Sequence, residues 1–372
     1  MASKATRVRT ESMVQRLSKQ PMSEGFELMD KGYTFGALRL FQFKVETSPP
    51  FQVAPCLDAL ATLLLILGET DEFVTTLELA VEKYKLVQNP ILAKVMQIRI
   101  ADVQVGSEVA AGIADEAVAS IGEVKDPKTK GAAGRLYHTR AEIRASLGKV
   151  TEAIEDLNIA IGYAWERVHL SHGLLGDLRR QQNDNAGAMA SYECAIAANK
   201  SFVQAYMSLI PLLREAKNNE RALELCTKVQ GLRPSCALVK ERAFTLSEMG
   251  NDVEAIDILN TAIRNPPHDE TEAHMGIGNS VVQLHKAKCA IYADLEKYIE
   301  ASDSITCALA VTKEEDPEAK RMYADLQEVI SKDYLQRTQL TPLLDALVEQ
   351  TLAQRPKNVE AFLLKLLENG KV

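Results

Sequence analysis

Small and large apolar residues recur along this chain at the spacing of one helix face. Between Gly134 and Pro267, a small residue is followed four positions later by a larger one, and three positions after that by another small or medium one. Steps of four and three place all three side chains on the same side of a helix. The copies of this triplet are Ala153/Leu157/Ala160, Ala188/Tyr192/Ala195, Ala222/Cys226/Val229 and Ala255/Leu259/Ala262. Each triplet predicts a helix whose small residues let a neighbouring helix approach closely.

The triplets recur at intervals of about 34 residues, which is the period of a helical-hairpin repeat. Gly148 and Gly250 stand where a preceding helix must end, Leu175-Gly176 precedes the second triplet, and Pro267 follows the last. This pattern resembles the tetratricopeptide repeat. The resemblance implies an all-α fold in which hairpins stack into a right-handed helical solenoid. Such a solenoid lengthens by the addition of hairpins and has no single central core.

Weaker copies of the pattern lie on both sides of the clear repeats. Ala37 and Phe41 occupy the small and large positions near the amino terminus, and Ala301 and Ile305 restore them further along. The chain is therefore predicted to comprise a flexible basic arm (1–17), three divergent hairpins (18–124), a linker loop with three lysines (125–133), the regular array with an insertion near 268–290 (134–315), and a connecting helix with a terminal helix pair (316–372).

Leucines crowd the end of the chain, where the repeat frame stops after Tyr334. Arg355-Pro356 separates two short helices there, and Asn358 is expected to cap the second. Two short helices cannot bury this many leucines alone, but pairing with a second helix pair into a four-helix bundle would cover them. The residues predicted to form this dimerisation and docking surface are Leu340, Pro342, Leu343, Leu344, Leu347, Val348, Pro356, Phe362, Leu363 and Leu366.

This tail resembles the dimerisation–docking helix pair of the regulatory subunit of protein kinase A, and more closely its Dumpy-thirty relatives. The matching positions are Pro342, Leu343, Leu344, Leu347, Arg355, Pro356, Asn358, Phe362 and Leu363, whereas Val359 stands where a second proline is usual. The resemblance implies a homodimer, or a heterodimer with a related tail, whose paired helices receive an amphipathic helix of a partner. The alternative is an ordinary helix that caps the end of the solenoid.

A second candidate surface follows from the repeat frame, because tetratricopeptide proteins bind peptides along the concave side lined by the first helices. The inward positions predicted here are His138, Glu142, Asp177, Arg180, Gln204, Met207, Arg214, Lys240 and Phe244. They are polar and of both charges. The carboxylate clamp of chaperone-binding members is absent, because Glu142 stands where that clamp has asparagine, so a chaperone adaptor is disfavoured.

Composition argues against several partners. The formal net charge of −8 disfavours a general nucleic-acid or anionic-membrane binder. The longest apolar run, Ala59 to Leu67, is too short to span a bilayer. The six cysteines contain no CxxC pair and are expected to be free thiols. The first twenty residues are basic, which suits either a flexible arm or a mitochondrial-type presequence.

Catalytic and cofactor motifs are not apparent in the sequence. His169 and His172 could share a helix face, but no third or fourth metal ligand is placed with them. Gly276-x-Gly278 lacks both the third glycine and the preceding strand of a dinucleotide site. We therefore expect no enzyme activity, no catalytic residues, no metal and no cofactor.

The function predicted from these patterns is a non-enzymatic protein–protein interaction scaffold. Because docking tails of this kind are concentrated in axonemes, the resemblance favours a cytoplasmic structural subunit of a ciliary or flagellar complex, similar to a radial-spoke component. The same tail also occurs in chromatin methyltransferase assemblies, which keeps a nuclear location open. A mitochondrial or chaperone-linked adaptor is a further alternative.

Overall fold

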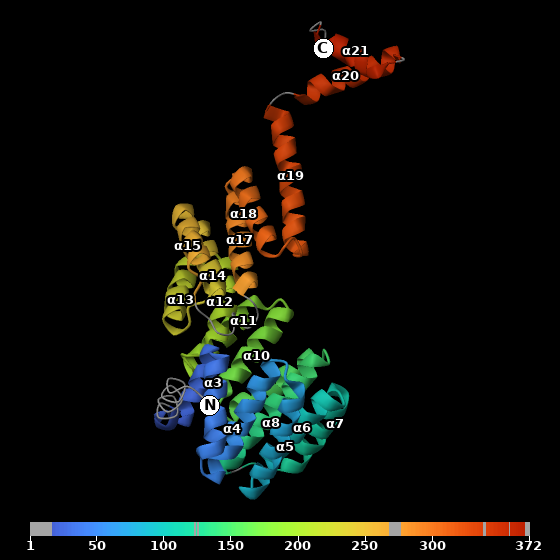
Figure 1. The fold of residues 1–372 in the computed structure, drawn as a ribbon. Coiled ribbons are helices and arrows are strands. Elements are labelled where there is room, and N and C mark those ends of the chain that lie inside the picture. Colours follow the sequence, from blue (N-terminus) through green and yellow to red (C-terminus); the bar gives the residue numbers. More distant parts are fainter. Residues whose placement is uncertain are drawn as a thin grey trace, which may run out of the picture. The chain divides into compact units, whose positions relative to one another are not determined.

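The computed structural model of the protein describes residues 17–122, 124, 126–267, 277–337, 340–356 and 358–368. Every regular element among these residues is an α-helix, and Figure 1 labels most of them. The chain divides into two compact units, Met1–Met249 with Pro267–Met275, and Gly250–Pro266 with Gly276–Val372. The predicted all-α solenoid of helical hairpins is confirmed. The basic arm predicted at 1–17 lies outside the described residues except for its last position.

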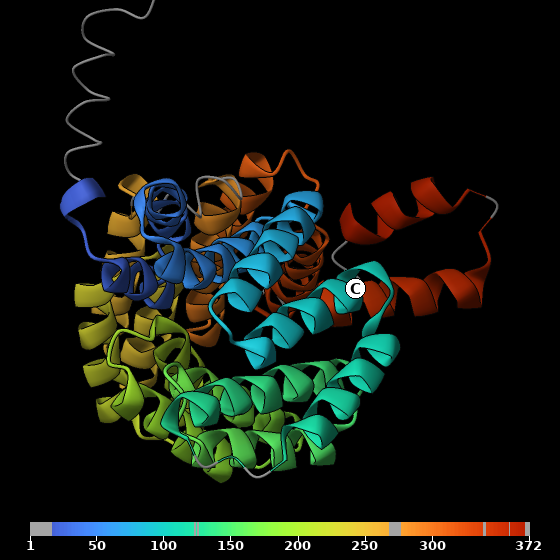
Figure 2. The same cartoon turned by 90° about the horizontal axis from the view of Figure 1, so that it is seen from below.

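The first unit is a series of hairpins in which each helix packs against the next. Figure 2 shows these hairpins following one another around a common axis, with the colours running from blue through green to olive. Its helices are α2 (Met22–Lys31), α3 (Thr34–Thr47), α4 (Pro50–Ile66), α5 (Thr70–Leu86), α6 (Pro90–Gln104), α7 (Ser107–Ile121), α8 (Pro127–Ser146), α9 (Val150–Gly162), α10 (Val168–Gln181), α11 (Asn185–Ala198), α12 (Val203–Glu215), α13 (Asn219–Leu232) and α14 (Cys236–Glu248).

The repeat triplets lie where the pattern predicts, on the buried faces of the second helices. Ala153, Leu157 and Ala160 of α9 have no exposed surface, and the later triplets are equally or almost equally covered. Gly176 in α10 shows how tight the packing is, because a Cβ added there would lie 2.6 Å from a ring carbon of Tyr192. A side chain at this position would therefore push two helices of one hairpin apart.

The linker predicted at 125–133 is wrong over most of its length, because α8 begins at Pro127. Asp126 caps the helix by accepting a hydrogen bond from the backbone N–H of Thr129, and proline suits the first helical position because it lacks the N–H that would be unpaired there. Gly134 lies inside the same helix, where an added Cβ would be 3.1 Å from Cβ of both Tyr163 and Trp165. Pro127 therefore begins a helix, and Gly134 allows the close approach of Tyr163 and Trp165.

The second unit contains the short helix α15 (Asp252–Arg264), the hairpin of α17 (Ile277–Asp294) and α18 (Tyr298–Val311), the long helix α19 (Pro317–Arg337), and the tail, which comprises α20 (Leu340–Gln354) and α21 (Val359–Glu368). Ala301 and Ile305 of α18 are fully buried, as the restored frame predicts. Of the predicted insertion, 268–276 lies outside the described residues and the remainder belongs to α17.

Lys286 fastens α19 to the hairpin before it. Its ammonium group lies 2.7 Å from Asp316 and 2.6 Å from Glu318, and Ala319 and Leu326 of α19 join the apolar core of α17 and α18. The first part of α19 is thus packed as the next helix of the solenoid. Among the described residues, no helix is both long and apolar enough to cross a membrane.

Replacing Gly176 by alanine should lower the free energy of unfolding by about 1–3 kcal/mol, because the new methyl group overlaps the Tyr192 ring. Gly112→Ala is the matched control. Nothing lies within 4 Å of a Cβ at that helical position, so the same substitution should stabilise α7 by about 0.5–1 kcal/mol. Denaturant unfolding followed by circular dichroism measures both, and equal effects would contradict the packing described here.

Candidate partner-binding site

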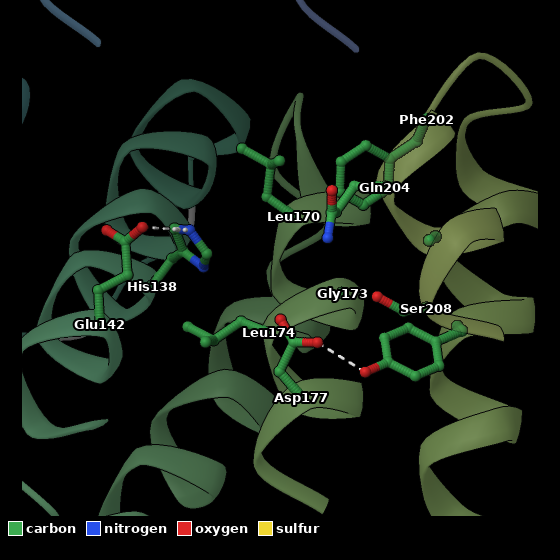
Figure 3. Close-up of a pocket in the computed structure, with 11 residues that line it drawn as sticks. His138, Glu142, Leu170, Gly173, Leu174, Asp177, Phe202, Gln204 and Ser208 are labelled. Carbon is green, nitrogen blue, oxygen red and sulfur yellow. Dashed lines mark hydrogen bonds and ion pairs between the residues drawn. The ribbon is translucent and has the colours of Figure 1, made fainter. Parts of the chain in front are cut away.

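A hollow of about 180 Å³ lies on the first helices of successive hairpins in the first unit. It brings together four of the predicted concave residues, His138 and Glu142 from α8, Asp177 from α10 and Gln204 from α12 (Figure 3). The other lining residues are Leu170, Gly173, Leu174, Tyr192, Phe202, Ala205 and Ser208. The repeat frame thus predicted the polar wall of the hollow but not its apolar wall.

Asp177 and Tyr192 form the polar pair of this hollow. The Tyr192 hydroxyl donates a hydrogen bond of 2.6 Å to Oδ1 of Asp177. Burial raises the pKa of Asp177, although the bond from Tyr192 and the charge of Arg180 both act to lower it. Burial and the neighbouring carboxylate raise the pKa of Tyr192, which keeps its hydroxyl protonated as a donor. Tyr192, which fills the large repeat position, therefore also orients a carboxylate that lines the hollow.

His138 is held in place by a chain of hydrogen bonds. The Trp165 indole N–H donates to the Ser171 hydroxyl at 3.0 Å, and this hydroxyl lies 3.1 Å from Nδ1 of His138. Nε2 of His138 lies 3.5 Å from Glu142. His138 itself is only 5% exposed, so it supports the wall and presents Glu142 to the hollow.

Glu142 carries the most strongly shifted carboxyl group of this wall. Desolvation by the surrounding protein acts to raise the pKa of Glu142, but the interactions with His138, Arg99 and Arg135 lower it to about 2. Glu142 is therefore ionised throughout the physiological range. Together with Asp177 it gives the hollow two acceptor groups for hydrogen-bond donors of a ligand.

The remaining predicted residues do not line this hollow, although the charge of Arg180 acts on Asp177. Arg180 is exposed on α10, and Met207 is half-buried against the core around Tyr192. Arg214, Lys240 and Phe244 form a second group, in which the Arg214 guanidinium lies over the Phe244 ring at 5.1 Å and 3.6 Å from Glu241. Lys240 lies 3.8 Å from the same carboxylate. These cations are thus engaged within the protein.

A buried ion cluster around Asp58 was not predicted. Asp58 of α4 accepts hydrogen bonds from Arg99 of α6 at 2.6 Å and from Arg135 of α8 at 2.9 Å. A cavity of about 480 Å³ lies beside it, walled by Tyr84 and Trp165 among others. A signal was present in the sequence, because Asp58 is the single charged residue of an otherwise largely apolar helix.

The tail forms an apolar groove between α20 and α21. Leu344, Val348 and Leu352 are 48%, 55% and 68% exposed there, although all are large aliphatic residues. The groove is lined by Leu344, Leu347, Val348, Thr351, Leu352, Val359 and Leu363. Asn358 caps α21 as predicted, because its side chain accepts a hydrogen bond of 3.0 Å from the N–H of Ala361.

The other predicted docking residues are only partly described. Pro356 lies between the two helices and Phe362 is half-buried on α21, whereas the side chains of Leu340, Pro342, Leu343 and Leu366 lie outside the described residues. Within the part of the chain that the structure describes, no group of three or more histidine, cysteine or acidic side chains could hold a metal ion.

Comparisons with known proteins identify the architecture. No protein-family model matches the sequence, and no curated protein matches it. Among solved structures, the chain is similar to one in the Cut9–Hcn1 hetero-tetramer of the APC/C, with 14% identity, a TM-score of 0.52, and coverage of 80% of this chain and 54% of that one. The fold is a tetratricopeptide-type solenoid. Identity this low shows the fold and no more.

Further similar structures are tetratricopeptide proteins of bacteria. One from Parabacteroides merdae has 14% identity and a TM-score of 0.42, covering 74% of this chain and 99% of its own. The carboxy-terminal part of another, from Cytophaga hutchinsonii, has 14% identity and a TM-score of 0.48, covering 70% of this chain and 97% of its own.

Replacing Tyr192 by phenylalanine should raise the pKa of Asp177, because the hydroxyl that stabilises the ionised carboxylate is removed. Carbon-13 NMR titration of the aspartate side chains measures this shift. Tyr206→Phe is the control, since the Tyr206 hydroxyl donates to the backbone carbonyl of Lys200 and not to Asp177. An unchanged Asp177 pKa in Tyr192→Phe would show that the hydrogen bond does not form in solution.

Proposed function

We propose that this protein is a non-enzymatic scaffold that binds a partner segment on the concave side of its solenoid and pairs with a second chain through α20 and α21. The observation that carries the proposal is the groove of the tail, where large aliphatic residues are half or more exposed. Exposed apolar surface of this kind marks an interaction site. The tetratricopeptide-type fold supports a scaffold, and a chain of similar fold occurs in the Cut9–Hcn1 hetero-tetramer.

The tail is proposed to form a four-helix bundle with the tail of another copy. Leu344, Val348 and Leu352 lie along one side of α20 at steps of four, so that they form a continuous stripe. A second copy of the same stripe is complementary to it in a two-fold arrangement. An amphipathic helix of a partner is proposed to bind across the paired helices.

Val348→Asp should convert the dimer to a monomer without loss of helicity, because Val348 is already 55% exposed in the single chain. Ala353→Asp is the control, since Ala353 is an exposed residue of the same helix that does not line the groove. Multi-angle light scattering gives the mass. A wild-type chain that is monomeric, or a Val348→Asp chain that stays dimeric, would refute pairing through the tail.

Charge reversal at Arg180 tests the concave surface. Arg180→Glu places a negative charge beside Asp177, which should weaken a bound segment at least about tenfold while leaving helicity unchanged. Lys149→Glu, in the exposed turn between α8 and α9, makes the same charge change away from the hollow. Proteins that co-purify with each tagged variant from cells can be quantified by mass spectrometry. Equal recovery with both variants would exclude this part of the surface from partner binding.

The proposed location of the protein is the axoneme of a cilium or flagellum, in a complex similar to a radial spoke. This part of the proposal is supported by the resemblance of the tail to docking helix pairs, including Arg355-Pro356 and Phe362-Leu363. Endogenous fluorescent tagging followed by detergent extraction of cells tests it. Retention of the protein in the extracted axoneme is expected, whereas a nuclear or mitochondrial signal would favour one of the other scaffolds.

A further inference from the structure

Helix α2, near the start of the first unit, also contacts a part of the same unit that is distant in sequence. Helix α2 packs against α3 as the first hairpin, and it also contacts residues that follow it by more than a hundred positions. Asp30, at the end of α2, is only 8% exposed because Arg167, His169 and Asn199 surround it. This contact closes the succession of hairpins into a ring within the first unit.

The three side chains around Asp30 converge on one carboxylate. Arg167 donates to Oδ1 at 2.5 Å, the Asn199 amide donates to Oδ2 at 2.7 Å, and Nε2 of His169 lies 3.3 Å from Oδ1. Burial acts to raise the pKa of Asp30, yet His169 and Arg167 hold it below its usual value. Charge-assisted bonds of this kind are stronger than neutral ones. The α10–α12 side of the ring therefore carries a socket for an acidic side chain.

The same arginine also contacts an aromatic residue one turn earlier on α2. The guanidinium of Arg167 lies 5.5 Å from the centre of the Phe26 ring, and Phe26 and Asp30 are four residues apart on one helix face. The socket thus contacts two features of a helix, an aromatic ring and an aspartate that follows it after one turn.

The place where α2 and the turn after it meet Arg167, His169, Asn199 and Leu232 is the seam of the ring. The contacts of α2 across the seam are polar, unlike its other contacts. Phe26, Leu28 and Met29 pack into the apolar core that α2 shares with α3 to α8, and no residue of α10 to α13 belongs to that core among the described residues. A further contact at the seam is polar too, because the Tyr33 hydroxyl donates to the backbone carbonyl of Leu232 at 3.2 Å. Polar contacts exchange with water at little net cost, so the ring should open here before it opens elsewhere.

A substitution at Gly32 would disturb the same seam. Its φ of 83° lies in the left-handed region, and an added Cβ would be 2.0 Å from Nη1 of Arg233. The turn after α2 is thus shaped to let the Arg233 side chain approach the backbone. The close approach of Gly32 and Arg233 supports a closed state of the ring in which α2 occupies the socket.

We propose that Arg167, His169 and Asn199 form a receptor for an acidic helix, that α2 fills it at rest, and that a partner helix with an aromatic residue and an aspartate one turn later displaces α2. This inference deepens the scaffold proposal and rests on it, because it gives the chemistry of one partner and the step that admits it. Displacement of α2 opens the ring at its seam.

The test uses the full chain and a fluorescent peptide of residues 20–34, which carries Phe26 and Asp30. Asp30→Arg in the chain repels Arg167 and empties the socket, so the peptide should bind this variant at least about tenfold more tightly than it binds the wild type. Glu78→Arg is the control, an equal charge reversal at an exposed position of α5. It should bind the peptide no better than the wild type does.

Peptides carrying Asp30→Asn or Phe26→Ala should lose at least about tenfold in affinity for the Asp30→Arg chain. Equal binding of all peptides, or no binding to any chain, would overturn the proposal. Should Asp30→Arg fail to fold, Asp30→Asn replaces it, with faster amide hydrogen exchange at the start of α10 than in Glu78→Gln as the expected result. Unchanged exchange there would also overturn it. Because no cellular partner enters these tests, their failure leaves the scaffold proposal standing.

Discussion

Close contact between helix backbones is the constraint on which the rest of this structure depends. Ala153, Ala188, Ala222 and Ala255 have no exposed surface, and each lies where a larger side chain would force two helices apart. Since a hairpin contacts mainly its neighbours, these small residues set the angle at which each pair of helices meets the next. The positions of His138, Asp177 and Gln204 on one hollow follow from that stacking, because all three lie on first helices.

Buried carboxylates add a second level of order. Asp58 accepts from arginines of two later hairpins, and Asp156 of α9 accepts from Arg140 and Arg144 of α8, which also reach Asp115 of α7. Burying such pairs gains little net free energy, but removing one partner leaves a buried charge and costs much more. Apolar stripes alone tolerate sliding, whereas a carboxylate with two fixed donors permits one arrangement. These clusters therefore select which helix faces meet.

The sequence was sufficient to predict the hairpins, since the triplet around Leu157 or Leu259 depends only on local spacing. It also predicted the cap at Asn358 and that side chains of α8, α10 and α12 lie together around one hollow, because both follow from position within a helix. The prediction of a linker at 125–133 was wrong because proline and glycine are common in loops. Only the fold shows that Pro127 begins a helix and that Gly134 allows a close contact. The contact of Asp30 with Arg167 joins positions far apart in the chain, and no local pattern indicates it. What sequence periodicity supplies is the repeating unit; how successive units close on one another depends on long-range polar pairs.

The length of α19 has a mechanical consequence. Leu326 is the last of its described residues in the apolar core, and the helix continues to Arg337 with support from side-chain pairs such as Glu328 with Lys332 at 2.6 Å. A helix rises about 1.5 Å per residue, so this part is a strut and not a slack tether. A rod of this kind holds its own far end away from the core of α17 and α18, so that this end of the helix cannot fold back and cover that core.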